Sequence, residues 1–282
     1  VLLIVLSQRE KKLMSKLLMC PPLYFDVEYD INPWMSSNRN KVDKDKAEKQ
    51  WRRLYNALRE VAEVYLIDPQ PGLPDMVFTA NAGFYKKKHN LVYISNFRNG
   101  ERKGEELHFI SWFKDSGYAV HYSQDRFEGE GDLLKGDLEQ HWIGYGFRSA
   151  KKLHDKFPFD EINNLHRLHL VDARFYHLDT CFAPLKENGV LWYPGAFDLE
   201  SQERIRKYTS KKNSIEVTEE EALTFACNAV IIKNHAFIPE CDSVAEKLTK
   251  LGYKVQQFNM SEFMKSGGAC KCLVMKIGKK DD

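Results

Sequence analysis

The chain has 282 residues, enough to bury a substantial core, and its 42 basic and 40 acidic side chains leave a formal net charge of +2. The two signs of charge are mixed along the sequence, which excludes the clustered basic stripe of a nucleic-acid-binding protein. Six cysteines without a CxxC pair or metal-ligand spacing favour the reduced thiols of a cytoplasmic protein over a disulfide framework or a metal site.

The first 35 residues contain two apolar runs and a mixed loop. Residues 1–6 are apolar but too few to span a bilayer, and they lack the basic region of a signal peptide, so we expect residues 1–16 to be an extension with no membrane partner. The run 17–20 is closed by two prolines and predicts a strand that ends in a turn. Residues 24–35 fit either a surface loop or a ligand-lining loop, and Asn32 before Pro33 is held extended or in a turn.

The next segments alternate between helix and strand. Apolar side chains at helical spacing predict an amphipathic helix over 44–62, followed by a strand at 64–67. A short buried strand is predicted at 76–78, with Asp75 and Asn81 at its ends, where each either lines a ligand or forms a turn. A strand at 91–94 leads to a helix through Arg102, which either binds a carboxylate or stays solvated.

An acidic cluster follows at residues 127–132, where Glu128, Glu130 and Asp132 alternate with glycines. In an extended segment these three side chains would point to one side, as a cation-binding wall requires. The alternative is an acidic surface loop. A predicted strand that begins at Trp142 then ends in a glycine-assisted turn, which presents Arg148.

The segment 174–184 contains a histidine next to an aspartate on one predicted face. If the segment is a strand, His177 and Asp179 project from the same side, so that an imidazole lies beside a carboxylate. Residues 189–193 are predicted to pair with this strand as a hairpin. Further on, helices are predicted at 199–207, 218–225 and 244–251, and strands at 228–232 and 236–238.

The C-terminal stretch brings a thiol to the start of a buried strand. The small residues from Ser266 to Ala269 predict a loop, and the apolar residues 273–275 predict a strand. Cys272 is therefore a candidate nucleophile, although a free cysteine is also often a small buried hydrophobe. The alternation of short strands and helices predicts an α/β fold with one domain over 17–277 and a charged tail at 278–282. No nucleotide-binding glycine motif is present, so we expect no nucleotide cofactor.

These residues carry a resemblance to a known superfamily. The strings DMVFTANAG (75–83), FEGEGD (127–132), HLDTCF (177–182) and GGACKCL (267–273) resemble the guanidino-group-modifying enzymes of the amidinotransferase/deiminase superfamily. The strings MCPPLYFDVEYDINPWM (19–35), GYGFRS (144–149) and YPGAFD (193–198) resemble its arginine dihydrolase subgroup, whose members stand alone or are fused to an ornithine-cyclising domain. The resemblance extends from about residue 17 to residue 277.

The resemblance implies a pentein fold, which is a five-bladed α/β propeller of ββαβ modules around a central channel. It implies that Cys272 is the nucleophile and His177 the general acid and base. It also implies a substrate site, in which the arginines face the substrate carboxylate and Asp132 supports the acidic wall; its residues are Asn32, Asn81, Arg102, Glu128, Asp132, Arg148 and Asp179. Two positions depart from the usual pattern, because Glu130 and Cys270 stand where small residues are usual.

The implied reaction is hydrolysis of L-arginine to ornithine, carbon dioxide and ammonia through a covalent intermediate on the cysteine sulfur, with no cofactor and no metal. Relatives that release citrulline or dimethylamine tend to carry Asp where this chain has Asn81, so we expect the second hydrolysis to proceed here. An arginine deiminase, an amidinotransferase and a non-enzymatic arginine sensor or ribosome-binding pentein are the alternatives. The sequence leaves open whether the chain forms a homo-oligomer.

Overall fold

The computed structural model describes residues 15–151 and 164–279. Within these residues the strands form five three-stranded sheets of one design, in which an antiparallel pair is extended by a third, parallel strand. The apolar run 1–6, most of the predicted extension and the last three residues of the predicted tail lie outside the described residues.

The first sheet joins the two ends of the described chain. Strand β1 (Ser15–Met19) lies between β15 (Met275–Lys279), which is antiparallel to it, and β2 (Ala62–Leu66), which is parallel. Helix α2 (Lys44–Arg59) connects β1 to β2 and buries the apolar face that the sequence predicts. The predicted strands at 17–20 and 64–67 and the helix at 44–62 are confirmed, with shifts of a few residues at their ends.

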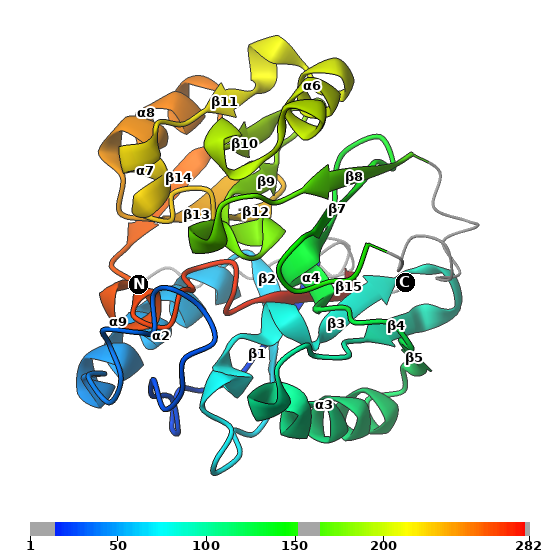
Figure 1. The fold of residues 1–282 in the computed structure, drawn as a ribbon, viewed down its shortest axis with the longest axis vertical. Coiled ribbons are helices and arrows are strands. Elements are labelled where there is room, and N and C mark those ends of the chain that lie inside the picture. Colours follow the sequence, from blue (N-terminus) through cyan, green and yellow to red (C-terminus); the bar gives the residue numbers. More distant parts are fainter. Residues whose placement is uncertain (1–14, 152–163, 280–282) are drawn as a thin grey trace.

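The other four sheets repeat this design in chain order (Figure 1). Their strands are β3 (Gly83–Lys86), β4 (Leu91–Ile94) and β5 (Ala119–Tyr122); β6 (Leu133–Lys135), β7 (His141–Tyr145) and β8 (Leu165–His169); β9 (Phe182–Pro184), β10 (Val190–Trp192) and β11 (Ile215–Glu216); and β12 (Val230–Ile232), β13 (His235–Pro239) and β14 (Lys254–Phe258). The predicted hairpin at 189–193 is confirmed, because β10 pairs antiparallel with β9.

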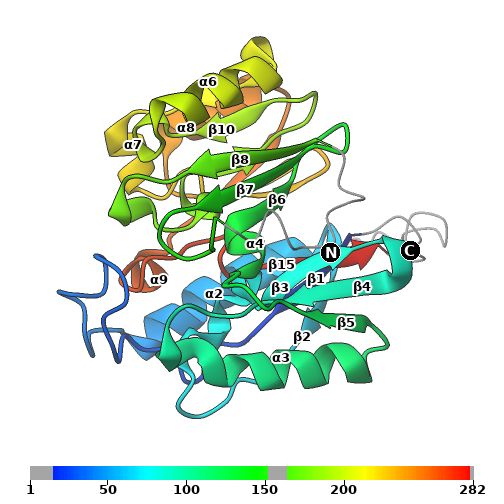
Figure 2. The ribbon, with the colours of Figure 1, turned by 45° about the vertical axis from the view of Figure 1, so that its right-hand side comes forward.

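Helices connect the parallel strands and lie on the outside of the molecule. Figure 2 shows α3 (Lys103–Asp115) running beside β5. The others of this kind are α6 (Leu199–Tyr208) and α8 (Asp242–Lys250), and the shorter helices are α4 (Gly129–Asp132), α7 (Glu219–Leu223) and α9 (Ser261–Met264). The innermost strands are β15 in the first sheet and β3, β6, β9 and β12 in the others; among them, β15 lies beside β3, and β9 lies beside both β6 and β12.

The predicted strand at residues 76–78 is wrong, and the acidic segment 127–132 does not take the extended form that would align its carboxylates. Met76 and Val77 belong to a 3-10 helix, Pro74–Val77, and Phe78 lies between it and a second one, Thr79–Ala82. Proline fits the first turn of such a helix because its missing N–H has no partner to lose. The acidic segment is not extended either, because Gly129 has a φ of +57° and residues Gly129–Asp132 form the short helix α4.

The segment of His177 and Asp179 is also not the predicted strand. His177 itself has extended backbone, but Leu178–Thr180 form a 3-10 helix, and the strand begins only at Phe182. The hydroxyl of Thr180 donates to the carbonyl of His177 over 2.6 Å and closes this turn. The two side chains therefore do not share a strand face.

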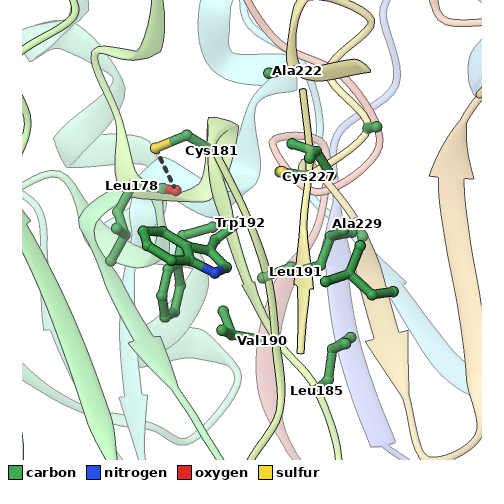
Figure 3. Close-up of a cluster of buried hydrophobic side chains, with 14 of the residues drawn as sticks. Leu178, Cys181, Leu185, Val190, Leu191, Trp192, Ala222, Cys227 and Ala229 are labelled. Atoms are coloured by element: carbon green, nitrogen blue, oxygen red, sulfur yellow. Dashed lines mark hydrogen bonds between the residues drawn. The ribbon is translucent and has the colours of Figure 1, made fainter. Parts of the chain in front are cut away.

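A large apolar cluster lies beneath this turn and fixes its position. Figure 3 shows Trp192 packed among Leu178, Leu191 and Val190, and the thiol of Cys181 donating to the carbonyl of Leu178 over 3.6 Å. These side chains are buried. Because interiors are close-packed, the cluster holds the turn that carries His177 and Asp179 in one place.

Candidate active site

Each of the five sheets places one buried polar residue shortly before its innermost strand. These residues come from separate parts of the sequence but from equivalent points of the repeated design; they are Cys272 before β15, Asn81 before β3, Asp132 before β6, Asp179 before β9 and Asn228 before β12. Since the five strands surround a common centre, the repeat brings these side chains together at one end of it. The site is therefore a product of the whole ring rather than of one motif.

Cys272 lies against an amide and a carboxyl group. Its sulfur is 3.4 Å from Oδ2 of Asp179, and the side-chain N–H of Asn228 donates to the sulfur over 3.1 Å. The same amide donates to the backbone carbonyl of Asp179 over 2.9 Å and accepts from the backbone N–H groups of Lys271 and Cys272. Asn228 thus fixes the thiol, its backbone and the neighbouring carboxyl group together.

Burial and charge keep a proton on this sulfur. Burial raises the pKa of the Cys272 thiol well above its ordinary value, and the nearby Asp179 raises it further. Burial also raises the pKa of Asp179 to about 7, although Lys271 and the bonds from Cys272 and Asn228 act in the opposite direction. A cation placed between the two groups would favour both charged forms.

His177 pairs with a carboxylate that has further partners. Its Nε2 lies 2.7 Å from Oε2 of Glu128, and Arg148 donates to the same oxygen over 3.0 Å. Burial acts to raise the pKa of Glu128, but the charge of Arg148 and the bond from His177 hold it below its ordinary value. Arg148 also donates to the carbonyl of Ile31 and lies over the ring of Tyr176. Its planar group therefore orients Glu128 in this structure.

Asp132 binds the backbone of two neighbouring segments of the site. Its two oxygens accept backbone N–H bonds from Leu178 over 3.2 Å and from Ser149 over 3.1 Å. It thereby connects α4 to the turn after His177 and to the turn that carries Arg148. Burial raises the pKa of Asp132 to about 6.

Asn81 and Arg102 form a second buried network. Arg102 binds both oxygens of Glu105 and donates over 2.8 Å to Oδ1 of Asn81 and over 3.1 Å to the carbonyl of Asp75. Nδ2 of Asn81 is buried and has no partner among the described residues, and Oδ1 of Asp179 is in the same position. Because buried polar atoms are rarely left unpaired, Nδ2 of Asn81 is a candidate donor, and Oδ1 of Asp179 a candidate acceptor, for a bound molecule.

Asn32 shapes the loop that leads to the thiol. Its side chain donates to the carbonyl of Ser266 over 3.0 Å and accepts from the backbone N–H of Trp34 over 3.0 Å. The following Gly267 has a φ of +82°, and a Cβ there would lie 2.9 Å from Oδ1 of Asn32. The predicted loop at 266–269 is confirmed, while the strand after it begins at Met275 rather than at residue 273.

Glu130 and Cys270 lie apart from these groups. The carboxylate of Glu130 pairs with Lys271 over 2.9 Å and accepts from the backbone N–H of Lys276 over 3.0 Å. It therefore binds different groups from Glu128, whose partners are His177 and Arg148. Cys270 is buried in an apolar cluster and its pKa is raised by burial. Among the hydrogen bonds of the described residues, none joins Glu130 or Cys270 to the sulfur of Cys272.

The sequence reasoning did not single out several residues of this site. Asn228 was placed at the start of a predicted strand without a role, although its position before an innermost strand matches those of Asn81 and Cys272. That repeated position is the signal that would have identified it. Glu105 and Lys271 had no such signal, because their partners Arg102 and Glu130 become neighbours only in the fold.

The described residues contain neither a clustered metal site nor a membrane-crossing helix. Over 15–151 and 164–279, no group of three or more His, Cys, Asp or Glu side chains has an arrangement that would hold a metal ion. Over the same ranges, none of the helices combines the length and the apolar character needed to cross a bilayer.

Comparisons with known proteins identify relatives over nearly the whole chain. The bifunctional arginine dihydrolase/ornithine cyclodeaminase AgrE of Nostoc sp. is 43% identical over 267 residues, which are 93% of this chain but 38% of that protein. The N(G),N(G)-dimethylarginine dimethylaminohydrolase of Mycobacterium tuberculosis is 37% identical over 261 residues, which are 92% of this chain and 84% of that protein. This chain thus spans well under half of the length of AgrE.

Solved structures and a family model agree with these relatives. The N-terminal domain of ArgZ bound to product, an arginine dihydrolase of cyanobacteria, is 41% identical with a TM-score of 0.90 and covers 94% of this chain and 98% of that chain. A family model described as N,N dimethylarginine dimethylhydrolase, eukaryotic, matches residues 24–279. The predicted α/β pentein fold is confirmed, and this chain belongs to the N,N dimethylarginine dimethylhydrolase family of the guanidino-group-modifying superfamily.

Proposed function

We propose that this chain is an arginine dihydrolase, which converts L-arginine and two water molecules into ornithine, carbon dioxide and two ammonia molecules. The observation that carries the proposal is the buried thiol of Cys272, 3.4 Å from Asp179 and within the same site as the paired His177 and Glu128. The similarity to ArgZ and AgrE, both called arginine dihydrolases, supports it. We also propose residues 17–277 as a single catalytic domain and the cytoplasm as its location.

Substrate binding follows from charge. The guanidinium group of arginine stays cationic at any working pH, so its burial needs anions, and Glu128 and Asp179 supply them. The unpartnered Oδ1 of Asp179 is an acceptor for a guanidinium N–H. The bound cation also lowers the pKa of the Cys272 thiol, because it offsets the negative charge of Asp179. Substrate thus helps to create the thiolate that attacks it.

The first hydrolysis uses the sulfur and the imidazole in turn. The thiolate adds to the central guanidinium carbon, His177 protonates a departing amine, and ammonia leaves. A water molecule that gives its proton to His177 then attacks the S-linked carbon and releases the sulfur, which leaves a ureido group. Proton transfer of this kind contributes about 10²–10⁴ in rate. The carboxylate of Glu128, 2.7 Å from Nε2, holds the imidazole in position for these proton transfers.

The second hydrolysis depends on Asn81. Its Oδ1 is taken by Arg102, so its side-chain N–H group without a protein partner is left to donate to a ureido oxygen. An ionised aspartate in this place would accept only and would repel that oxygen. We infer that the amide holds the ureido group for a second attack by Cys272, which releases ornithine and leaves a carbamoyl group on the sulfur. A second water molecule releases this group as carbamate and frees the thiol, and carbamate then decomposes to carbon dioxide and ammonia.

Product analysis with purified protein and isotope-labelled arginine tests this function. We expect two ammonia molecules and one ornithine per arginine, no activity in Cys272→Ala, and retained activity in Cys270→Ala. We expect Asn81→Asp to accumulate citrulline.

One ammonia per arginine from the unmodified protein would instead indicate a deiminase, and unchanged ornithine output from Asn81→Asp would contradict the role of the amide. Activity only with an added amine acceptor would indicate an amidinotransferase. Dimethylarginine is assayed in parallel because the family model carries that substrate in its name.

A further inference from the structure

A second set of charged groups surrounds a small cavity further along the innermost strands. The cavity has a volume of about 50 Å³, and it is lined by residues of β6, β9, β12 and β15 together with Glu130, Ala229 and Lys271 from the segments just before three of these strands. Its apolar side is formed by Phe182 and Ile231, and its charged side by Glu130, Lys271 and Lys276. Lys271 is the chain neighbour of Cys272, but none of the candidate catalytic groups Cys272, His177 and Asp179 lines the cavity.

Lys276 reaches this cavity from strand β15. Successive residues of a strand point to opposite faces, and its neighbours Met275 and Ile277 are both buried in the apolar cluster that contains Leu18 and Phe109. The side chain of Lys276 therefore points the other way, toward the centre of the ring. This places an ammonium group in the lining.

The charges of the lining do not balance. The carboxylate of Glu130 is engaged by the ammonium of Lys271 at 2.9 Å and by the backbone N–H of Lys276, and Lys271 also donates to the carbonyl of Val274 over 2.9 Å. The ammonium of Lys276 has no hydrogen bond or ion pair among the described residues. Burial lowers the pKa of Lys276, and repulsion by Lys271 lowers it further while Glu130 acts to raise it. The third lysine of the lining, Lys135, pairs with Glu139.

We propose that this cavity is a binding site for a small monovalent anion such as formate, bicarbonate or chloride, held by the ammonium of Lys276 with Lys271 beside it. A cation in a partly apolar enclosure needs a counter-charge, and one monovalent anion balances the lining. The volume is that of a few water molecules, which suits an anion of one to four heavy atoms. The site is distinct from the proposed catalytic site and holds whether or not the chain is an arginine dihydrolase.

Calorimetry and thermal unfolding with sodium formate and sodium chloride test the site, at constant pH and ionic strength. Gluconate serves as an anion of equal charge that is too large for the cavity. We expect formate or chloride, but not gluconate, to bind and to raise the melting temperature. In Lys276→Met we expect the anion to bind about tenfold or more weakly, since a hydrogen bond to a charged group is lost. The matched control is Lys212→Met, which removes an exposed lysine elsewhere.

A second variant keeps the test decisive if Lys276→Met does not fold. Glu130→Gln removes the carboxylate that competes for the two ammonium groups, so the anion is expected to bind more tightly than to the unmodified protein. Equal binding of gluconate, unchanged binding in Lys276→Met, or weaker binding in Glu130→Gln would each overturn the proposal. Circular dichroism establishes that each variant compared is folded.

Discussion

The amide of Asn228 holds Cys272 from two sides, because Nδ2 donates to the sulfur over 3.1 Å and Oδ1 accepts the backbone N–H of the same residue over 3.2 Å. One side chain thus fixes both the direction of the thiol and the turn that carries it. The donated hydrogen bond acts to lower the pKa of the thiol against the larger effect of burial. In the proposed mechanism it stabilises the thiolate when the substrate has bound.

The first prediction concerns this amide. We expect Asn228→Ala to lower kcat by about tenfold to a hundredfold, because a hydrogen bond to a charged sulfur is lost. We expect Asn228→Asp to be worse, since it keeps the backbone acceptor but places a negative charge beside the sulfur and raises the pKa of the thiol. The rate of Cys272 alkylation against pH, followed by peptide mass spectrometry, measures this. Equal activity of the two variants would show that charge at residue 228 is unimportant.

The second prediction is a pair of opposite shifts in the pH profile. Asp179 must be ionised to hold the substrate cation, and its pKa of about 7 means that kcat/KM rises as the pH rises through that value. Lys271 acts to lower this pKa and Glu130 acts to raise it. Lys271→Met should therefore move the acidic limb to higher pH, and Glu130→Gln should move it to lower pH, each by about one unit.

The control for these shifts is Lys212→Met, whose profile should match that of the unmodified protein. Shifts of the same sign in both variants would count against Asp179 as the group that titrates. The same raised pKa affects folding. A buried Asp179 with a pKa above its ordinary value contributes stability below that ordinary pKa, and this contribution is lost as the pH rises through about 7.

The third prediction concerns the close approach of α4 to two site residues. A Cβ on Gly131 would overlap Nδ2 of Asn81 and lie 3.3 Å from the ring of His177. We expect Gly131→Ala to displace these groups and to lower kcat/KM by about 10²-fold, because small misplacements are costly in catalysis. Gly100→Ala is the control, since nothing lies within 4 Å of a Cβ there. Steady-state kinetics of both variants tests this prediction. Near-normal kcat/KM in Gly131→Ala would contradict it and would show that α4 moves to accommodate the added methyl group.

The fourth prediction separates two roles for Arg148. The sequence resemblance implies that it faces the substrate carboxylate, whereas in the structure its planar group binds Glu128 and the carbonyl of Ile31. If orientation of Glu128 is its main role, Arg148→Lys lowers kcat more than it raises KM, because a lysine cannot make both bonds in a plane. A large rise in KM with unchanged kcat would instead favour direct contact with the substrate.

Residue pattern predicted the elements of this fold better than the local geometry of its site. Long periodic segments such as 44–62 and plain strands such as 91–94 could be predicted because burial of one face or of a whole strand dictates their pattern. The stretch around Met76 has the same apolar character but forms 3-10 turns, since Pro74 starts a turn. Apolar side chains alone cannot distinguish these outcomes over a few residues.

The side chain that each site residue contacts is set by the packing of segments that are distant in the sequence. His177 and Asp179 were expected to work as neighbours, yet His177 pairs with Glu128, while Asp179 lies against Cys272. The two members of each pair are separated by dozens of residues, so the spacing of residues along the sequence could not predict the pairing. The residues in question could be found from the resemblance, but their partners required the three-dimensional structure.

The pairing of β15 with β1 has a consequence for how the protein is made. During synthesis the ribosome can release four of the five sheets in order, while the sheet of β1 and β2 keeps an open edge. Cys272 and the strand that fills this edge leave the ribosome almost together, three residues apart. The carboxylates and the imidazole of the site are therefore synthesised early, whereas the reactive sulfur is added only when the last strand closes the ring. A chain that stops before this point lacks the proposed nucleophile.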